Sequence, residues 1–272
     1  MDSYELLACD IDGTLLDKEK NVSQATVDAF AELKKAGKQI VLISARMPKA
    51  IRYLQKDLLI LQSPLIAYNG GLTFLSGEEP AAIHEEGLPP ALTEQIAGLL
   101  KGTEVQPGLY SADEWYVQKS DRLVEKEIFN TKTEPDMDLP AAVLRRWEQR
   151  GQKVHKVMLM GSAEDMKKVD QRMKDSTLQG FEVYRSKDVM FEITSSATSK
   201  ENALKTLCDK LGVPLSKVVA IGDNDNDIGM IQAAGCGVAV ENAKDKLKEV
   251  ADMITDKNTE DGVAKAIRKL FF

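Results

Sequence analysis

Residues 10–15 read Asp-Ile-Asp-Gly-Thr-Leu, and they directly follow the apolar run Leu6-Leu7-Ala8-Cys9. A run of this kind is typical of a buried strand, so both aspartates are expected where that strand leaves its sheet. Neighbouring carboxylates repel each other and lose water when they are buried, which favours a cation between them. The stretch therefore predicts a charged site at the end of a buried strand.

A second segment shows the same pattern far along the chain. Residues 218–227 read Val-Val-Ala-Ile-Gly-Asp-Asn-Asp-Asn-Asp, an apolar run that ends in Asp223, Asp225 and Asp227. Asp, Asn and Gly are also the commonest turn residues, so either segment alone is equally consistent with an ordinary turn. The two together indicate an oxygen-ligand site for a hard divalent metal.

Composition narrows the class of protein. The 272 residues are 43% hydrophobic and 29% charged, which is typical of a soluble globular protein with one large domain or two modest ones. The net charge of −7 argues against a nucleic-acid partner, because such proteins usually carry a basic surface. No apolar run approaches the length of a membrane span, so we also expect no membrane partner.

Cysteine and histidine usage limits the chemistry. Cys9, Cys208 and Cys236 each lie in an apolar context without metal-ligand spacing, which predicts buried thiols in a reducing compartment. The acidic N-terminus shows no signal peptide, so a cytoplasmic location is expected. With only His84 and His155 available, a multi-histidine metal site is excluded, and any catalysis is expected to use carboxylates.

Strands and helices alternate at both ends of the chain. The N-terminal part predicts helices at residues 23–36 and 48–59 and strands at residues 39–44 and 65–67. Ser23 is the expected N-cap of the first helix. The C-terminal part predicts helices at residues 199–211, 226–234, 243–250 and 260–270 and strands at residues 218–222 and 236–240. This alternation predicts an α/β fold, a Rossmann-like parallel sheet with helices on both faces.

The middle of the chain lacks this regular alternation. It predicts strands at 114–119 and 156–160 and helices at 91–100, 141–150 and 164–174, interrupted by proline, glycine and polar stretches. We interpret residues 85–189 as an inserted α+β domain with a half-exposed antiparallel sheet. The catalytic core would then consist of residues 1–84 and 190–272.

Two weaker signals accompany the aspartates. Lys200 falls in the first turn of a predicted helix, with Thr198 and Glu201 as a capping box; there the helix dipole disfavours a cation unless an anion is close. Ser44 follows a strand, where its hydroxyl and the following N–H groups can bind an anion. Each signal alone is also consistent with an ordinary surface lysine or helix-entry serine.

Together these features resemble the haloacid dehalogenase superfamily of phosphohydrolases. Four motifs match in order: residues 10–15, Ser44, Lys200 and residues 222–227. An insert between Ser44 and Lys200 is similar to the type IIB, Cof-like subfamily. The resemblance implies a Mg²⁺-dependent phosphatase of small phosphorylated metabolites that works through an aspartyl phosphate and whose inserted cap domain selects the substrate. We also expect a monomer or a weak homo-oligomer.

The resemblance also implies a role for each matched residue. Asp10 would be the nucleophile and a metal ligand, and Asp12 would be the general acid/base and give its main-chain carbonyl to the metal. Lys200 would bridge nucleophile and phosphate. The remaining implied metal ligands are Asp223 and, in the outer shell, Asp227. The implied phosphate contacts are Ile11, Ser44, Ala45, Lys200 and Asn226. Ala45 and Glu201 stand where the family often has glycine.

Two other functions remain open at this point. A phosphoglycosyl mutase would use the same nucleophile but return the phosphoryl group to a second hydroxyl, and a phospho-dependent receiver module would bind without turnover. The substrate also stays open among sugar phosphates, flavin mononucleotide and pyridoxal phosphate. Candidate contacts in the insert are Tyr110, Trp115, Tyr116, Lys119, Arg122, Arg185 and Lys187.

Overall fold

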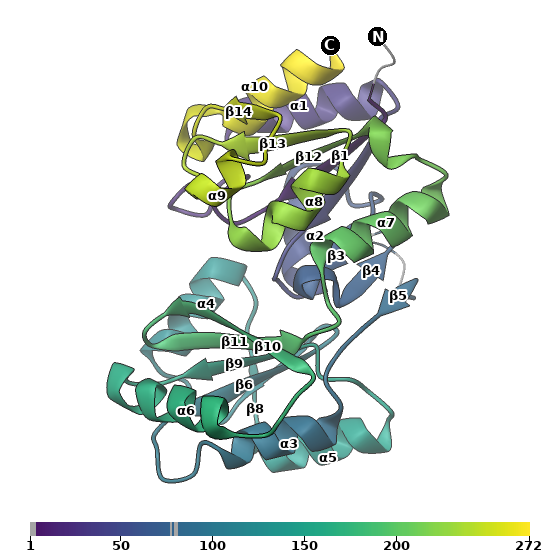
Figure 1. Ribbon diagram of the computed structural model, residues 1–272. Helices are drawn as coiled ribbons and strands as arrows, with labels where there is room; N and C mark the ends of the chain where they lie inside the picture. The colour runs from purple at the N-terminus through teal and green to yellow at the C-terminus, as the bar shows by residue number, and fades with distance from the viewer. Residues whose placement is uncertain (1–3, 77, 79–80) are drawn as a thin grey trace. The chain divides into compact units, whose positions relative to one another are not determined.

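The computed structural model describes residues 4–76, 78 and 81–272 (Figure 1). The chain forms two compact units, a core unit of residues 1–85 and 199–272 and an insert of residues 86–198. The sequence pattern predicts residues 190–198 in the core instead. They belong to the insert because strand β11 (Met190–Ser195) pairs with two other insert strands, β9 and β10.

The core unit contains one mostly parallel sheet. Among the described residues its strand order is β14-β13-β12-β1-β2-β3-β4-β5, and only β4 and β5 run antiparallel to their neighbours. Strand β1 lies between β12 and β2, so the strand order reverses at β1, which is where open α/β sheets bind ligands. The strands are β1 (Leu6–Asp10), β2 (Gln39–Ile43), β3 (Leu65–Ala67), β4 (Leu72–Phe74), β5 (His84–Glu85), β12 (Val218–Gly222), β13 (Cys236–Val240) and β14 (Met253–Thr255).

Helices cover both faces of this sheet, as predicted (Figure 1). Helices α1 and α10 pack against each other, and α7 packs against α8. The helices are α1 (Gln24–Lys35), α2 (Pro48–Asp57), α7 (Lys200–Leu211), α8 (Ile228–Ala233), α9 (Asp245–Lys248) and α10 (Gly262–Phe271). Short 3₁₀ turns are η1 (Tyr68–Gly70), η2 (Leu215–Lys217), η3 (Asp225–Asp227) and η4 (Asn258–Glu260).

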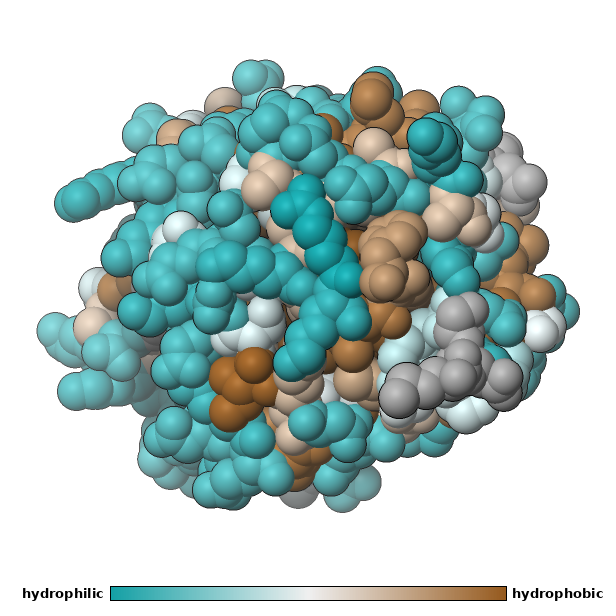
Figure 2. All heavy atoms as spheres, turned by 90° about the horizontal axis from the view of Figure 1, so that it is seen from above, coloured by the Kyte–Doolittle hydropathy of each residue, from teal (hydrophilic) through white to brown (hydrophobic). Residues whose placement is uncertain are grey.

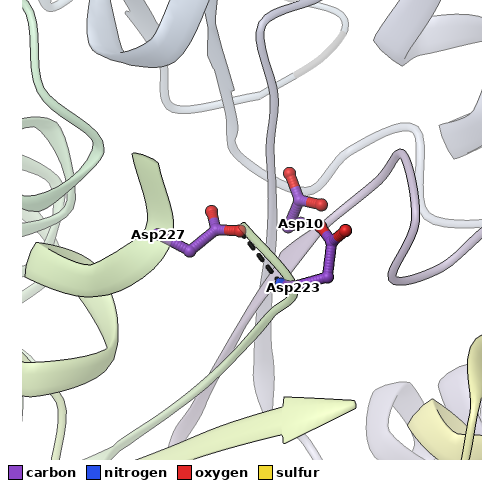
Figure 3. Close-up of side chains that lie close together, drawn as sticks. All are labelled: Asp10, Asp223 and Asp227. Carbon is purple, nitrogen blue, oxygen red and sulfur yellow. Dashed lines mark hydrogen bonds between the residues drawn. The ribbon is translucent and has the colours of Figure 1, made fainter. Parts of the chain in front are cut away.

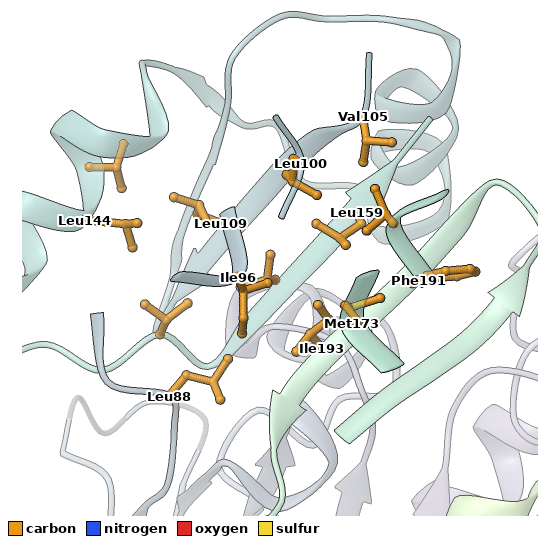
Figure 4. Packing of buried hydrophobic residues seen from close by; sticks show 14 of the residues in the cluster. Leu88, Ile96, Leu100, Val105, Leu109, Leu144, Leu159, Met173, Phe191 and Ile193 are labelled. Carbon is orange, nitrogen blue, oxygen red and sulfur yellow. The ribbon is translucent and has the colours of Figure 1, made fainter. Parts of the chain in front are cut away.

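The insert has its own sheet and its own hydrophobic core. Its strand order is β10-β11-β9-β6-β7-β8, antiparallel except for the β7–β8 pair. The side chains packed into its core, drawn in Figure 4, come from strands and helices alike, including Leu109, Leu159, Ile193 and Leu144. The elements are α3 (Pro90–Gly98), β6 (Gln106–Ser111), β7 (Glu114–Val117), α4 (Arg122–Thr131), β8 (Asp136–Met137), α5 (Pro140–Gln149), β9 (Lys156–Met160), α6 (Ala163–Asp175), β10 (Phe181–Lys187) and β11.

The prediction of a half-exposed sheet in the insert is wrong for the inner strands of that sheet. Strands β6 and β9 are buried along their whole length. On the face away from the hydrophobic core, Tyr110 stacks on Trp115 with ring centroids 5.2 Å apart, and the Lys156 ammonium lies 4.5 Å from the Tyr110 ring centroid. Tyr110, Trp115 and Lys156 are all buried on this face, where strand alternation alone predicts exposure to solvent.

The surface agrees with the composition. The face drawn in Figure 2 is mostly hydrophilic, with small hydrophobic groups between the polar side chains. In the part of the chain that the structure describes, no helix is both long enough and apolar enough to cross a bilayer. All three cysteines are buried and unbonded to one another, as predicted.

Candidate active site

Two neighbouring strands deliver the first acidic side chains to the same edge of the core sheet. Asp10 is the last residue of β1, and Asp223 directly follows β12. The two strands are parallel neighbours in which Cys9 lies opposite Ile221, so Asp10 and Asp223 leave the sheet side by side. Asp227 reaches the same place from η3, the turn that follows β12.

The Asp10, Asp223 and Asp227 carboxylates form one cluster, which we call the carboxylate triad (Figure 3). Each offers one oxygen, and these oxygens lie within 4.8 Å of one another. Gly13 permits this approach: its φ is +89°, and a Cβ there would lie 2.3 Å from Asp223 Oδ2. The Asp-x-Asp-Gly sequence thus supplies both a carboxylate and the space for another.

Lys200 is buried against this triad. Its Nζ donates to Asp10 Oδ1 at 2.5 Å and to Asp227 Oδ1 at 2.6 Å, and only 2% of the residue is exposed. Burial alone would lower the pKa of this ammonium, but the two carboxylates raise it above its usual range. Lys200 is therefore a fixed positive charge beside Asp10.

Burial acts in the opposite direction on the carboxylates. It raises the pKa of Asp10 well above its usual value, although Lys200 opposes the shift. Burial, together with the charge of Asp227, raises the pKa of Asp223 to about 6. The positive charge of Lys200 is thus too little to offset the effect of burial on the pKa of Asp10 and of Asp223.

Asp227 also fixes the loop that carries the triad. Its Oδ2 accepts hydrogen bonds from the main-chain N–H groups of Asp223 at 3.0 Å and Asn224 at 3.1 Å, the first of which is dashed in Figure 3. With Oδ1 on Lys200, both oxygens of this buried carboxylate are satisfied. Asp227 therefore joins the loop after β12 to the first turn of α7.

Asp12 lies outside the triad in a basic clamp. Arg46 Nε donates to its Oδ2 at 2.7 Å, Arg46 Nη2 donates to its Oδ1 at 2.8 Å, and Lys20 Nζ donates to Oδ1 at 2.7 Å. Desolvation opposes ionisation of Asp12, yet these two cations lower its pKa to about 2. Asp12 is thus a carboxylate at neutral pH in this arrangement.

The other residues expected to contact phosphate lie at the same sheet edge but differ in surroundings. Ser44, which directly follows β2, is buried, and its Oγ accepts from the Arg46 N–H at 3.2 Å. Ala45 is half-buried beside it, and Ile11 is fully buried directly after β1. Asn226 is half-buried on η3, where its Nδ2 donates to Asn69 Oδ1 at 3.0 Å.

Several residues that shape this site have no role predicted from the sequence. Arg46, Lys20 and Asn69 contact residues of the predicted motifs, and Thr14 Oγ1 donates to Asp223 Oδ1 at 3.3 Å. Thr14 lies within residues 10–15, and Arg46 lies two residues after Ser44, so their positions in the sequence were a usable signal. Lys20 lies in the loop between β1 and α1 and Asn69 lies in the turn η1, and the contacts of both depend on tertiary structure.

The start of helix α7 differs from the predicted capping box. Ser199, not Thr198, is the N-cap, and its Oγ accepts from the Asn202 N–H. Glu201 therefore occupies the second helical position, where it pairs with Lys205 one turn later. A Cβ on Gly229 would meet the Glu201 carboxylate at 2.6 Å, so this glycine makes room for the larger residue.

The candidate contacts of the insert lie in different surroundings. Tyr110 and Trp115 form the stacked pair described above, whereas Tyr116 packs edge-on against Trp147 of the hydrophobic core at 5.8 Å. Arg185 pairs with Asp170 on helix α6. Lys119 lies in the loop that follows β7, and Arg122 is the first residue of α4. The side chain of Lys187 lies outside the described residues.

Comparisons with known proteins show the family to which this chain belongs. Residues 7–267 match the family model of haloacid dehalogenase-like hydrolases. The chain is 28% identical over 270 residues to the 5-amino-6-(5-phospho-D-ribitylamino)uracil phosphatase YitU of Bacillus subtilis, covering 98% of this chain and 97% of that protein.

Solved structures give the same result. A haloacid dehalogenase-like hydrolase from Bacteroides thetaiotaomicron superposes with a TM-score of 0.87 at 30% identity, over 99% of this chain and 100% of the other. The subclass IIB sugar phosphatase BT4131 shares the fold with a TM-score of 0.78 at 23% identity, over 97% and 98% of the two chains. The chain therefore belongs to the haloacid dehalogenase-like hydrolases and is a phosphatase of that family.

Proposed function

We propose that this phosphatase hydrolyses small phosphorylated metabolites, with Mg²⁺ as its cofactor and Asp10 as the residue that receives the phosphoryl group. The supporting observation is the buried contact of Lys200 with Asp10 and Asp227. A buried ammonium fixed between two carboxylates, next to the third at Asp223, supplies the charge that a phosphate dianion needs beside a carboxylate nucleophile.

The donor set of the triad fits a divalent cation. Three carboxylates face the single positive charge of Lys200, and burial raises the pKa of Asp10 and of Asp223, so an added cation would favour the ionised form of both. We assign Asp10, Asp223 and the main-chain carbonyl of Asp12 as ligands, with Asp227 as an outer partner. When bound, Mg²⁺ supplies positive charge that offsets the phosphate dianion.

We propose two chemical steps. Asp10 attacks phosphorus while the bond to the leaving alkoxide breaks, and Asp12 gives a proton to that alkoxide. Asp12, now a carboxylate, then takes a proton from a water molecule that attacks the aspartyl phosphate, which releases orthophosphate and restores Asp10. Throughout, Lys200 offsets negative charge on Asp10 and on the phosphoryl group, while Ser44, Asn226 and the N–H groups of Ile11 and Ala45 hold phosphate oxygens.

The basic clamp on Asp12 adds a condition to this scheme. Arg46 and Lys20 keep Asp12 ionised, which suits the second step but not proton donation in the first. We propose that Asp12 leaves Arg46 when substrate binds and takes up a proton away from the clamp. Arg46 would then return Asp12 to its carboxylate form for attack by water.

The substrate class is part of the same proposal. The relative YitU is named for a phosphorylated ribitylamino uracil and matches this chain over nearly its whole length, so that compound is the first to test. Flavin mononucleotide, pyridoxal phosphate and sugar phosphates complete the panel. We further propose that the insert chooses among these compounds, since the residues assigned to the chemical steps all lie in the core unit.

The test measures phosphate release from this panel with Mg²⁺ and after its removal by a chelator. Asp10→Asn should lower turnover by at least about 10³-fold, because an amide cannot form the acyl phosphate. Asp28→Asn is the matched control, since Asp28 is exposed on α1. Mass spectrometry must exclude deamidation of the introduced asparagine back to aspartate.

Other outcomes would contradict the proposal in distinct ways. Turnover of Asp10→Asn within tenfold of the unchanged enzyme would contradict the assignment of Asp10 as the nucleophile. Isomerisation primed by a bisphosphate, without phosphate release, would identify a phosphoglycosyl mutase. Stable phosphorylation without turnover on any compound, including an aryl phosphate, would identify a receiver module.

A further inference from the structure

The turn between β3 and β4 has an unusual backbone. Tyr68, Asn69 and Gly70 have φ values of +54°, +55° and +106° in succession, and all three residues are buried. The left-handed region is unfavourable for a bulky residue such as Tyr68, and asparagine tolerates it better than most. Strained backbone of this kind persists where surrounding contacts fix it, often at a functional site.

Main-chain hydrogen bonds tie this turn to the segment after β2. The Tyr68 N–H donates to the Arg46 carbonyl at 3.1 Å, and the Asn69 N–H donates to the Ser44 carbonyl at 2.9 Å. The left-handed turn thus aims two successive N–H groups at the loop that carries Ser44 and the Asp12 partner Arg46. Its conformation fixes where that loop leaves the sheet.

A side-chain hydrogen bond ties the same turn to the segment after β12. Asn69 Oδ1 accepts from Asn226 Nδ2 at 3.0 Å, across 157 positions of sequence. This bond occupies one of the two amide hydrogens of Asn226 and sets which way its amide faces. Asn226 is thereby oriented before any ligand arrives.

Close packing ties the turn to a third segment. A Cβ on Gly70 would lie 2.3 Å from the main-chain oxygen of Ser199, the N-cap of α7, and 3.2 Å from Ala203 Cβ. The first residue of α7 is Lys200. The turn therefore touches the segments that carry Ser44, Asn226 and Lys200.

We infer that Asn69 is a positioning residue of the phosphatase site and that the Tyr68–Gly70 turn aligns the three phosphate-binding segments. The inference rests on the proposed function, in which Ser44, Lys200 and Asn226 bind the transferred group. Asn69 then has two separable roles: its backbone adopts the left-handed turn, and its side chain orients Asn226.

Asn69→Gly separates these roles, because glycine adopts positive φ freely but lacks the acceptor oxygen. We expect Asn69→Gly to keep or raise the melting temperature while kcat/KM falls about 10- to 100-fold, the loss typical of a misplaced contact. Leu59→Gly is the matched control, because Leu59 also has positive φ, at +57°, and its side chain is 67% exposed. It should relieve the same backbone strain without lowering kcat/KM.

A double-mutant cycle with Asn226→Ala gives the decisive comparison. If Asn69 acts through Asn226, the double variant should be no less active than Asn226→Ala alone. Calorimetric binding of orthovanadate in the presence of Mg²⁺ is the second readout, and Asn69→Gly and Asn226→Ala should weaken it by similar factors. A purely structural role would lower the melting temperature and leave vanadate affinity unchanged.

Two results would overturn the inference. One is an Asn69→Gly enzyme within twofold of the unchanged protein in kcat/KM and vanadate affinity. The other is a double variant in which the two losses simply multiply. If Asp10→Asn proves fully active, the proposed function fails on that separate result, and the vanadate measurements still decide whether Asn69 orients Asn226.

Discussion

The core unit and the insert each bury a lysine, and the two lysines lie in different surroundings. Lys200 is 2% exposed and contacts two carboxylates at 2.5 and 2.6 Å. Lys156 is 3% exposed, lies 3.7 Å from Glu192 and covers the face of Tyr110. Short contacts with several carboxylates mark a charge held for chemistry, whereas a longer pair over an aromatic ring suits packing or the selection of a ligand.

The largest expected effect follows from removing the core lysine. Lys200→Met should lower kcat by more than about 10³-fold, because no fixed charge then offsets the phosphoryl group. Without metal it should also destabilise the protein by about 3–5 kcal/mol, since buried carboxylates lose their partner. Denaturant unfolding with and without Mg²⁺ checks this, and added Mg²⁺ should recover part of the loss. Equal stability of both proteins without metal would show that the triad needs no cation.

Asp223→Ala tests the metal assignment next. In the unchanged protein, Mg²⁺ at 100 times its dissociation constant should stabilise the folded state by about 2.7 kcal/mol. Asp223→Ala should abolish most of this gain and shift the Mg²⁺ dependence of turnover to higher concentration. Asp225→Ala is the control, because Asp225 is exposed and pairs with Lys244. An unchanged Mg²⁺ titration in Asp223→Ala would contradict its assignment as a ligand.

Arg46→Met tests the clamp on Asp12. The folded-state pKa of Asp12 is about 2, below its unfolded value near 3.8, so the clamp stabilises the protein above about pH 4. Because 40% of the Asp12 side chain is exposed, we expect the clamp to stabilise the folded protein by only about 1 kcal/mol at pH 7.

Unfolding measured between pH 7 and pH 2 checks the sign of this effect. The contribution of Asp12 should be constant down to about pH 4 and be lost as the pH falls towards 2, so the variant and the parent should converge there. Arg268→Met, which removes an exposed contact with Glu32, should differ little from the parent at any pH, because an exposed ion pair contributes little to stability. A stability difference that grows on acidification would refute the assignment.

The smallest chemical effect is expected in the insert. Lys156→Met should reorder rates across the substrate panel several-fold while hydrolysis of acetyl phosphate stays within about threefold, because the reacting groups are untouched. Arg185→Met should change neither the ranking of rates across the panel nor the hydrolysis of acetyl phosphate, since Arg185 pairs with Asp170 on the surface. Steady-state rates on the whole panel measure this, and an equal loss on every substrate would contradict a selective role for the insert.

The sequence was sufficient to predict most of the core unit. Helix α1 with its Ser23 cap, strands β2 and β12, and β13 were predicted closely because buried parallel strands are continuous apolar runs and amphipathic helices repeat with a 3.6-residue period. The insert was harder. Strand β6 contains Pro107 and Gly108, which usually argue against a strand. Helix α4 was not predicted, and the residues it buries include the polar Glu127 and Thr131.

Some residues of the candidate site could be predicted from the sequence and others could not. Asp10 and Asp223 end apolar strands and were visible in the sequence, and so was the mismatch of Lys200 with its helix end. Arg46 and Asn69 were not assigned roles, because their partners Asp12 and Asn226 are set by strand order and by a turn conformation. Contacts between loops carry no periodic signal in one sequence.

The position of β1 at the centre of the sheet also has a consequence for synthesis. Its neighbour β12 is separated from it by residues 11–217, so a ribosome adding about 5–20 residues per second exposes β1 for roughly 10–40 s before that neighbour exists. During this time one edge of an apolar strand lacks its final partner, which is the condition that promotes aggregation. The insert is a continuous segment and is complete before β12 emerges. The nascent chain is therefore most vulnerable in its first strand, the strand that ends in Asp10.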